Sequence, residues 1–339
     1  MTKPFDFSEK PYLLFNGDAL ETMKTFESES VNCVITSPPY FQLRDYGFSE
    51  QLGLEPTFQA YLEKLWAVMD EVWRILKPQG TVFINLGDTY GTQSGAMRDG
   101  KFGAKNTNNQ AFIQPKLTHK CLLMIPARFA IGCCERGWIL RNDCIWHKPN
   151  GMPESVTDRF SKKHEHFFFF TKQQKYYFNL DAVREPLHES SIQRYSRGWE
   201  GNGERDYVHG KQNNLKKFYA NDEAKQQAIE RGKNPGDVFV VNTKPNSTEH
   251  YASYNLELLE KPMRAGCEKG GIVLDPFCGT STTGVSALIH GNKFVGIDGS
   301  AEYLKIAERN LRRANLEPSS FTSTRQDNLR ELPLFEAVE

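Results

Sequence analysis

The feature that most constrains the fold is a long amphipathic helix followed at once by a short apolar strand. Residues 59–76 place apolar side chains on one helical stripe, Lys-Pro-Gln-Gly at 77–80 predicts a stop, and residues 81–86 predict the strand. An apolar strand without an alternating polar face is typical of a parallel sheet that helices cover on both sides. The chain is therefore expected to adopt an α/β fold.

The same alternation of strands and helices recurs toward both ends of the chain. The expected strands are 12–15, 31–35, 81–86, 138–146, 271–274 and 293–297, and the expected helices are 19–26, 59–76, 122–136, 256–265 and 300–314. Ser300 is the expected cap of the last helix. Because the alternation of strands and helices is interrupted and then resumes, we predict one doubly wound, mostly parallel sheet with an insertion.

The insertion is expected at residues 151–245, where the residue composition of the chain changes. It contains two aromatic stretches, 167–170 and 176–178, that predict strands. Residues 190–221 are polar, with basic and aromatic side chains interspersed. The predicted organisation is a first core half at 1–150, the insertion at 151–245, a second core half at 246–315 and a tail at 316–339.

Composition disfavours several classes of protein. Basic and acidic residues balance at 42 each, so net charge indicates no partner, although residues 91–150 hold nine Lys/Arg against three Asp/Glu. Seven cysteines without a CxxC pair fit a reduced, intracellular protein. No apolar run approaches the ~20 residues that span a bilayer, and the first residues lack the layout of a signal peptide, so no membrane association is expected.

A glycine-containing turn and an acid on the next strand predict a site for an adenosine-containing ligand. The turn, Asp275-Pro-Phe-Cys-Gly-Thr-Ser-Thr-Thr-Gly284, leads into a helix whose N-terminus favours a carboxylate or phosphate. Asp298 lies 19 residues after Gly279, where a carboxylate can accept hydrogen bonds from both ribose hydroxyls. The turn is neither GxGxxG nor a P-loop, which disfavours dinucleotides and nucleoside triphosphates. The alternative is a tight turn with a surface Asp.

Asn16, Gly17 and Asp18 end another expected strand. A carboxylate at the same edge of the sheet could receive the exocyclic amine of an adenine. An ordinary Asn-Gly-Asp turn is the simpler interpretation, and the segment alone favours it.

Ser37, Pro38, Pro39 and Tyr40 follow the expected strand 31–35 and suggest chemistry on an amine. Proline fixes the backbone, so a carbonyl can be held rigidly beside the Ser37 hydroxyl, and the two make a pair of acceptors for an NH₂ group. A ring amine is a poor nucleophile because its lone pair is delocalised, and two acceptors would favour a pyramidal nitrogen with that lone pair freed. Tyr40 offers a face for stacking. The alternative is a strand-ending turn with Tyr40 in the core.

Together these segments resemble the amino-group DNA methyltransferases that use S-adenosylmethionine. Thr36-Ser-Pro-Pro-Tyr40 resembles their catalytic motif, Asp275-Pro-Phe-Cys-Gly279 their methionine-binding loop, and Asp298 their ribose-binding acid. The catalytic motif precedes the cofactor loop, as in the circularly permuted beta group, and residues 151–245 resemble its target recognition domain. The resemblance implies the class I methyltransferase fold and S-adenosyl-L-methionine as cofactor, with no metal.

The resemblance also implies a role for each motif residue. The implied catalytic residues are Ser37, Pro38, Pro39 and Tyr40, with the amine bound by the Ser37 hydroxyl and the Pro39 carbonyl. The implied cofactor-binding residues are Asp18, Asp275, Phe277, Gly279, Thr280, Ser281, Thr282 and Asp298. The target base must leave the duplex to reach such a pocket, because its amino group is otherwise paired.

Two positions depart from the family pattern. Ser281 stands at the second glycine of Phe-x-Gly-x-Gly, and Asn255 stands where the family often carries proline. A small residue is expected to fit at 281. No cofactor contact is assigned to residues 253–255.

The expected target is cytosine N4, because in this family the first motif residue tends to be Ser for cytosine N4 and Asp or Asn for adenine N6. Adenine N6 is the alternative. Methylation of cytosine C5 is disfavoured, since it needs a nucleophilic Cys, usually after Pro, and no Pro-Cys pair occurs. More remote alternatives are an RNA or protein methyltransferase and a non-catalytic DNA-binding module. His164 and His166 share one strand face, but no third metal ligand is evident.

Double-stranded DNA is the expected partner. A homodimer and a cognate restriction endonuclease acting on the same site are both compatible with the resemblance. The expected location is the cytoplasm, in a prokaryote or phage context, with association to the nucleoid through DNA. The recognition sequence depends on contacts in the DNA grooves and is not readable from the chain.

Overall fold

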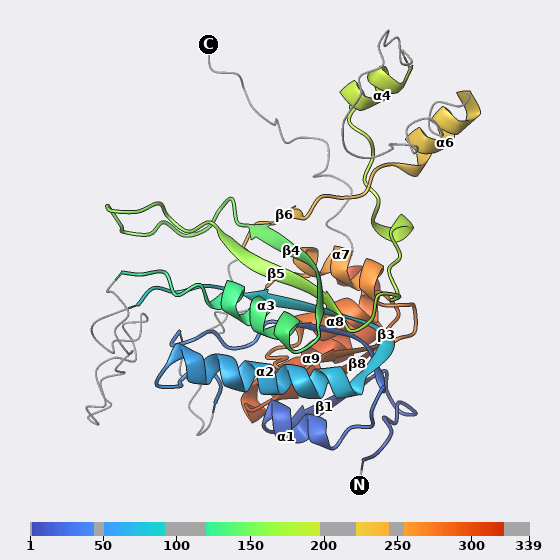
Figure 1. Cartoon of the computed structure of the whole chain (residues 1–339). Coiled ribbons are helices and arrows are strands. Elements are labelled where there is room, and N and C mark those ends of the chain that lie inside the picture. The colour runs from blue at the N-terminus through green and yellow to red at the C-terminus, as the bar shows by residue number, and fades with distance from the viewer. Residues whose placement is uncertain (1, 44–50, 92–119, 197–221, 244–253, 322–339) are drawn as a thin grey trace. The chain divides into compact units, whose positions relative to one another are not determined.

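The structure is a computed structural model that describes residues 2–43, 51–91, 120–196, 222–243 and 254–321 (Figure 1). The chain divides into two compact units. The first joins Met1–Phe178 to Asp237–Glu339, and the second is Asn179–Gly236. All residues with a sequence-predicted role in chemistry belong to the first unit.

A sheet forms the centre of the first unit, and its eight described strands lie in the order β1-β8-β7-β2-β3-β5-β4-β6. The strands are β1 (Tyr12–Asn16), β2 (Val31–Thr36), β3 (Leu76–Leu86), β4 (Ile139–His147), β5 (His164–Thr171), β6 (Val238–Val240), β7 (Ile272–Asp275) and β8 (Lys293–Asp298). Among them only β5 runs against the others, pairing antiparallel with β3 and β4. The predicted doubly wound, mostly parallel sheet is confirmed.

The sheet changes its winding direction between β2 and β7, which are neighbours. From β2 the chain crosses through α2 (Phe58–Ile75) to β3 on one side, and from β7 it crosses through α8 (Thr282–Ile289) to β8 on the other. In doubly wound folds, ligands bind at the carboxyl ends of the strands at such a switch point. The two turns that follow β2 and β7 are the two sequence motifs.

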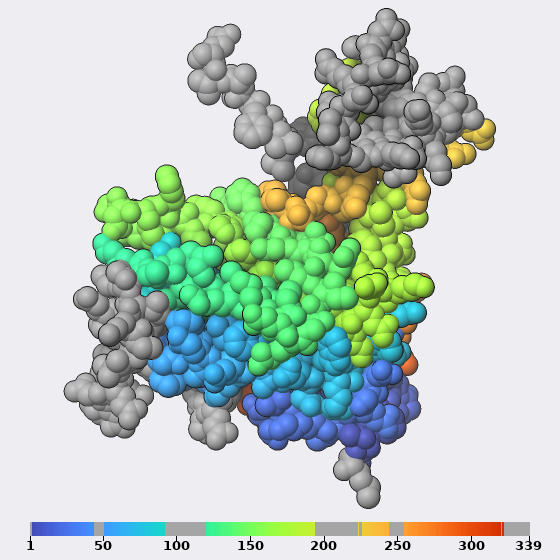
Figure 2. Space-filling model, in the orientation of Figure 1, coloured from blue at the N-terminus to red at the C-terminus, as the bar shows by residue number. Residues whose placement is uncertain are grey.

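Helices cover both faces of the sheet. α1 (Ala19–Lys24), α2 and α3 (Ile125–Glu135) contribute to the core on one face, and α7 (Leu256–Gly266), α8 and α9 (Ala301–Leu316) to the core on the other. In Figure 2, α2 in blue and α3 in green form part of the surface turned to the viewer. The expected helices are therefore present, with α3 starting three residues later than predicted.

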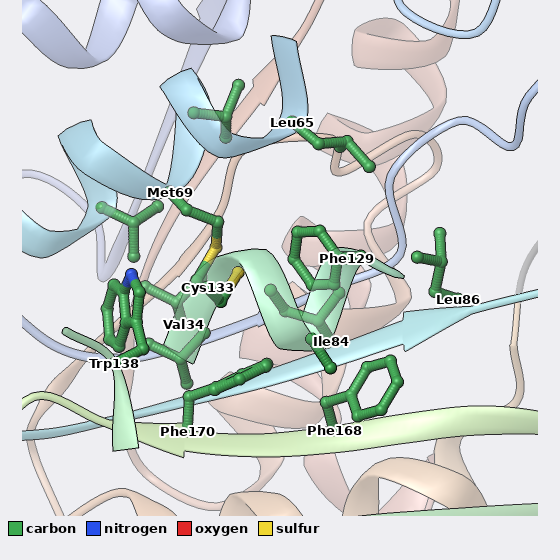
Figure 3. Close-up of a cluster of buried hydrophobic side chains, with 14 of the residues drawn as sticks. Val34, Leu65, Met69, Ile84, Leu86, Phe129, Cys133, Trp138, Phe168 and Phe170 are labelled. Atoms are coloured by element: carbon green, nitrogen blue, oxygen red, sulfur yellow. The ribbon is translucent and has the colours of Figure 1, made fainter. Parts of the chain in front are cut away.

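Alternate residues of β5 enter the two different cores. Phe168 and Phe170 belong to the core under α2 and α3, and Phe167 and Phe169 belong to the other core. This alternation follows from the two-residue repeat of a strand. Figure 3 shows the first core, in which the ring of Phe129 lies 6.2 Å from those of Phe168 and Phe170. The predicted buried strand at 167–170 is confirmed.

The helix α2 stops before residues 77–80 as predicted, but β3 begins earlier than the predicted residue 81. The helix ends at Ile75 and β3 begins at Leu76, so residues 77–80 belong to the strand and form no separating turn. Val31 pairs with Leu76, and Cys33 pairs with Thr81. Residues 77–80 therefore form a bulge opposite Asn32. A Cβ at Gly80 would lie 2.9 Å from the Asn32 carbonyl oxygen, which explains the glycine. Proline and glycine mark a bulge here.

Residues 176–178 do not form the strand predicted for them. The rings of Tyr176 and Phe178 instead pack on Phe169, with centroids 5.6 Å apart in each pair. The aromatic run is explained by side-chain packing on the sheet, and one backbone hydrogen bond of 2.9 Å, from the Tyr177 N–H to the Gln79 carbonyl oxygen, ties it to β3.

The second unit does not coincide with the insertion expected at 151–245. The four phenylalanines of β5 fill both cores, so this strand lies inside the sheet, and the second unit begins only at Asn179. Its described elements are η1 (Asp181–Val183), α4 (Glu189–Ser196) and α6 (Asp222–Arg231). Glu185 and Lys233 pair antiparallel within it.

The expected loose tail begins later than residue 315. α9 is capped by Ser300 as predicted, continues to Leu316, and is followed by η2 (Pro318–Phe321). Residues 92–119 of the basic stretch 91–150, most of the polar stretch 190–221 and the tail beyond 321 lie outside the described residues. None of the described helices combines the length and the apolar character that crossing a bilayer demands.

Candidate active site

The sequence-predicted residues gather at the carboxyl edge of the sheet. Thr36 ends β2, Asp275 ends β7 and Asp298 ends β8, and these three strands are consecutive in the sheet. Asp18 follows β1, the next strand. The Ser-Pro-Pro-Tyr turn and the glycine-containing turn therefore start side by side at the switch point.

Asp275 joins the two turns through hydrogen bonds. Its Oδ1 accepts the Thr36 hydroxyl at 2.6 Å and the Phe277 backbone N–H at 3.0 Å. Its Oδ2 accepts the Thr283 hydroxyl at 2.6 Å, and the Tyr254 hydroxyl lies 2.5 Å from that of Thr283. Burial raises the pKa of Asp275 to about 6, against the lowering effect of these donors. Asp275 is 2% exposed, and its contacts are those of a residue that positions both turns.

The turn after β7 is shaped by Gly279 and held by Asp298. Gly279 has a φ of 51°, and no described atom lies within 4 Å of the place where a Cβ would stand. Asp298 accepts the Gly279 N–H at 2.9 Å through Oδ2 and the Ser300 N–H at 2.8 Å through Oδ1. Burial raises the pKa of Asp298. Each carboxylate oxygen has two acceptor positions, so both oxygens can accept a further bond from a ligand hydroxyl.

Ser281 adopts a backbone conformation that favours glycine. Its φ is 70°, and it lies immediately before α8. The side chain is fully buried, and its hydroxyl has no hydrogen-bond partner among the residues that the structure describes. Thr280 and Thr282, on either side, are half-buried. The backbone path that a glycine takes without strain is thus kept with a serine.

Asp18 caps a helix. Its Oδ1 accepts the Glu21 N–H at 2.9 Å, and the side chain is exposed. Asn16 binds the end of the neighbouring β8, donating to the carbonyl oxygens of Asp298 and Gly299 at 3.0 and 3.1 Å. The simpler interpretation as a turn at a helix start is confirmed. An adenine contact by Asp18 stays a prediction.

Tyr40 is fixed by its hydroxyl and by its ring. The hydroxyl lies 2.7 Å from Glu165 Oε2 and 3.1 Å from Asn85 Oδ1. A Cβ at Gly87 would stand 2.6 Å from the ring, so the glycine makes room for it. Burial and the charge of Glu165 hold the pKa of Tyr40 well above its usual value, so its hydroxyl stays protonated and donates to the carboxylate. Tyr40 is half-buried, partly packed on the core.

The acceptors of the motif keep free capacity. Pro38 is buried, while Ser37 and Pro39 are half-buried. The Pro39 carbonyl accepts the Tyr61 hydroxyl at 2.7 Å, and its second lone pair can accept another donor. Ser37 Oγ lies 3.5 Å from Asn85 Oδ1, at the outer limit of a hydrogen bond. Two neutral acceptors thus stand at the end of β2.

Sequence reasoning missed Tyr61, Asn85, Lys148 and Glu165, which surround the motif. Asn85 donates to Glu165 Oε2 and to the His166 carbonyl, both at 3.1 Å. Lys148 forms an ion pair with Glu165. The available signal for Asn85 was its amide inside an apolar strand. Glu165 gave no signal, because its position depends on the antiparallel pairing of β5 with β3.

His164 and His166 build no metal site with other described residues. No group of three or more His, Cys, Asp or Glu side chains in the described parts of the chain could hold a metal ion. His166 Nδ1 lies 2.9 Å from Asp143 Oδ1. Burial, with the nearby His166 charge, lowers the pKa of His164.

A surface cleft lies at the opposite edge of the sheet. Its volume is about 410 Å³, and its lining includes Asn32, Lys77 and Glu268. These residues lie near the starts of β2, β3 and β7. No motif residue lines the cleft, so the predicted chemistry does not belong there.

Comparison with known proteins places this arrangement in a family. The family model for DNA methylases of the N6/N4 type matches residues 31–309. The Type II methyltransferase M.XycI of Xanthomonas campestris pv. cyanopsidis is 36% identical over 304 residues, which are 89% of this chain and 88% of the relative. The chain belongs to the DNA methylase family of the N6/N4, amino-group type.

Two solved structures share the fold. A putative DNA modification methylase of Thermus thermophilus, complexed with S-adenosyl-L-methionine, is 22% identical with a TM-score of 0.54, over 89% of this chain and 94% of that one. The PvuII DNA methyltransferase, described as cytosine-N4-specific, is 16% identical with a TM-score of 0.57, over 94% and 96%. The predicted fold class is confirmed by these likenesses.

Proposed function

We propose that this protein transfers a methyl group from S-adenosyl-L-methionine to the N4 amine of a cytosine flipped out of duplex DNA. The observation that carries the proposal is the 2.6 Å hydrogen bond from Thr36 to Asp275. It joins the turn expected to bind the amine to the turn expected to bind the methyl donor. Methyl transfer needs the two reacting atoms about 3–3.5 Å apart and in line, and a short link between the turns favours such alignment.

The end of β2 would bind and orient the amine. The Ser37 hydroxyl and the Pro39 carbonyl would accept its two hydrogens, and Tyr40 would stack on the base. Both acceptors are neutral, so they orient the nitrogen and do not deprotonate it beforehand. As the N–C bond forms, the S–C bond of the methyl donor breaks and a neutral thioether leaves, and the nitrogen then loses its extra proton to solvent water. Pro38, buried between the acceptors, would keep them at a fixed separation.

The ends of β7 and β8 would hold the cofactor, which when bound supplies an electrophilic methyl group. Asp298 retains acceptor positions for both ribose hydroxyls, and the open space beside Gly279 suits a closely approaching ligand. The remaining predicted contacts are those of Asp18 to adenine, and of Phe277, Thr280, Ser281 and Thr282 to the methionine part. Asp275 would support the cofactor loop indirectly, by accepting hydrogen bonds from the Thr36 hydroxyl and the Phe277 N–H.

Cytosine N4 is preferred over adenine N6 because Ser37 begins the motif. The structural likeness to a cytosine-N4-specific enzyme supports the fold, at 16% identity, and leaves the base open. Two neutral acceptors can hold either amine, so adenine N6 remains the second candidate.

We further propose that the reaction is site-specific and that the second unit, Asn179–Gly236, takes part in reading the sequence. M.XycI, the relative at 36% identity, is named a Type II methyltransferase. A restriction endonuclease acting on the same site would then be a functional partner. A homodimer stays a prediction from the resemblance.

The test is incubation of the purified protein with unmethylated plasmid and S-adenosyl-L-methionine, followed by nucleoside mass spectrometry. N4-methylcytosine is the expected product. N6-methyladenine would keep the mechanism and overturn the choice of base. If no base were methylated although the cofactor bound, DNA would be rejected as the substrate.

A matched pair of variants tests the role of the motif. Ser37→Ala should bind the cofactor normally and lose methyl transfer, because one amine acceptor is missing. Ser8→Ala removes an exposed hydroxyl away from the motif and should behave as the wild type. Full activity of Ser37→Ala would remove the hydroxyl from the mechanism.

A further inference from the structure

The loop between β4 and β5, residues 148–163, presents two large apolar side chains to solvent. Phe160 is 97% exposed and Met152 is 85% exposed. Figure 1 shows this loop reaching beyond the ends of β4 and β5, and Figure 2 shows it as a green projection at the upper left. Two large apolar side chains exposed on one loop make that loop a candidate for contact with a partner, and the loop's backbone, position and charge indicate which partner.

The backbone around Phe160 is held by side chains of the loop itself. Glu154 Oε2 accepts the Arg159 guanidinium at 2.6 Å and the Lys162 N–H at 3.3 Å. Arg159 also donates to the Phe160 carbonyl oxygen at 3.0 Å, and its guanidinium lies 4.2 Å from the centre of the Tyr90 ring. Bonds on both sides of Phe160 thus fix its backbone, while the ring itself points into solvent.

The loop starts and ends at the edge of the sheet that carries the candidate active site. It follows the carboxyl end of β4 and precedes β5, whose Glu165 binds the Tyr40 hydroxyl. Lys162 donates to the carbonyl oxygen of Asp88, just after β3. Glu165 is the fifth residue after Phe160, so their Cα atoms lie within about 18 Å of each other. That span is about five base-pair rises of duplex DNA.

The charge of the loop favours a polyanionic partner. Residues 148–163 contain four Lys/Arg and two Asp/Glu. Both acids are engaged within the protein, Glu154 by Arg159 and Asp158 by Lys120. Lys163 is held by the Gly151 carbonyl oxygen at 2.6 Å. Exposed apolar tips on a net positive loop match a duplex, in which phosphates flank an apolar base stack.

We propose that Phe160, together with Met152, is a wedge that enters the base stack of duplex DNA where the target base leaves it. The proposal rests on the proposed function, because a flipped base leaves a gap in the stack. Apolar side chains that fill or open a base step are a known device of DNA-bending proteins. A phenyl ring in the gap replaces the lost stacking and so keeps the target base outside the duplex.

The test compares Phe160→Ala with the wild type on two oligonucleotide duplexes that contain a site found methylated in plasmid. One duplex is fully paired, and the other carries a mismatch opposite the target base, which weakens the pairing in advance. Phe160→Ala should slow methylation of the paired duplex about 10- to 100-fold. The mismatched duplex should be methylated at nearly the wild-type rate.

Three controls distinguish a wedge from a general loss of activity or of folding. Leu316→Ala, a truncation of a 68% exposed side chain on α9, should leave both rates unchanged. Phe160→Trp should retain most of the activity on the paired duplex. The melting temperature of Phe160→Ala should equal that of the wild type. A lower value would show that the ring packs against another part of this chain and would overturn the proposal.

The remaining outcomes of the duplex experiment also test the wedge proposal. Equal slowing on both duplexes would reject the wedge, since the defect would not concern base opening. Unchanged rates on both would reject it as well. Wild-type protein that methylates no DNA would fail the proposed function itself, and this failure is recognised before any variant is compared.

Discussion

At the scale of single residues, Glu165 is the clearest addition to the motif. Its carboxylate lies between the Tyr40 hydroxyl and the Lys148 ammonium, and it also accepts a bond from Asn85. This hydrogen bond of 2.7 Å restrains the Tyr40 hydroxyl and with it the orientation of the ring. Glu165 is therefore a positioning residue, acting through Tyr40.

We expect Glu165→Gln to lower kcat about 10-fold, the equivalent of one charge-assisted hydrogen bond, while cofactor affinity stays unchanged. The reason is that a neutral amide at position 165 holds the Tyr40 hydroxyl less strongly than the Glu165 carboxylate does, so the Tyr40 ring is less restrained. Steady-state kinetics on plasmid DNA, with cofactor binding measured separately, check this prediction.

The chain contains a matched control for this variant. Glu308 accepts the Tyr12 hydroxyl at 2.9 Å and the Lys10 ammonium at 3.1 Å, the same three residue types away from the site. Glu308→Gln should leave kcat unchanged. Equal losses in both variants would indicate general destabilisation and contradict a positioning role.

Ser281 gives a prediction about stability. Its φ of 70° is costly for a residue with a Cβ, and its buried hydroxyl lacks a partner among the described residues. We expect Ser281→Gly to raise the free energy of unfolding by about 1 kcal/mol, after the greater chain entropy of glycine is subtracted. Urea unfolding at neutral pH measures it.

Ser286→Gly is the control for Ser281→Gly. Ser286 is also buried but lies inside α8, where glycine costs helix stability, so this variant should be less stable than the wild type. A loss of stability in Ser281→Gly would mean that the serine is not strained.

Sequence reasoning found the residues that stand in local motifs and missed those that reach the site from elsewhere. Ser37, Gly279 and Asp298 lie at or just after strand ends, so strand ends sufficed to place them. Asn85 reaches Tyr40 through the parallel pairing of β3 with β2, whereas Glu165 reaches it only because β5 inserts antiparallel beside β3. A single chain carries no local signal for that pairing.

At the scale of elements, Asp275 couples the ends of β2 and β7 and should make their stability depend on pH. Its pKa is raised from 3.8 to about 6, so the folded state favours the protonated form. The stabilisation is fully present below pH 3.8 and is lost as the pH rises through about 6.

We therefore expect Asp275→Asn to change the pH dependence of stability. Between about pH 4 and 7 the wild type should lose about 2 kcal/mol of unfolding free energy relative to the variant, somewhat less than the full effect of ~2 pKa units, because at pH 4 this carboxyl group is already about half ionised in the unfolded chain. Denaturant unfolding of both proteins across this range measures the difference. A difference that did not vary with pH would contradict the raised pKa.

Elements were predictable where one physical pattern dominated. The apolar stripe placed α2, and Ser300 marked the start of α9. The end of α2 before residues 77–80 was predicted correctly, but β3 starts at Leu76 instead of Thr81 and residues 176–178 form no strand, because proline, glycine and aromatic residues serve two purposes. They end elements in some contexts, and in others they form bulges or pack on a sheet.

At the scale of the whole molecule, most of the second unit, residues 187–231, lies in sequence between two segments that pair with each other. Glu185 and Lys233 exchange backbone hydrogen bonds of 3.0 and 2.8 Å, so the two chain segments are adjacent within the unit. A linker of about four residues, the length of a hairpin loop, can replace residues 187–231.

We expect this shortened protein to fold and to bind the cofactor with unchanged affinity, but to lose methylation at specific sites. The physical reason is that α4 and α6 are removed while both cores of the first unit remain intact. Thermal unfolding, cofactor titration and sequencing of methylated plasmid check the three parts. Retained site preference would exclude residues 187–231 from target recognition.

The overall architecture was predictable because alternating strands and helices have few compact solutions. The extent of the second unit was not, since β5 has the aromatic composition that suggested a separate region. Its role in both cores becomes clear only from the position of Phe167 and Phe168 on opposite faces of one sheet.

The order of the strands in the chain also determines when the sheet can form during synthesis. Ser37 leaves the ribosome early, whereas the partner strands β7 and β8 are completed only at Asp298. At 5–20 residues per second this delay is roughly 13 to 50 seconds. β1 likewise waits for β8, its neighbour in the sheet. Neither half of the core is therefore complete before β8 is synthesised. A truncated translation product that lacks β7 and β8 should not methylate DNA.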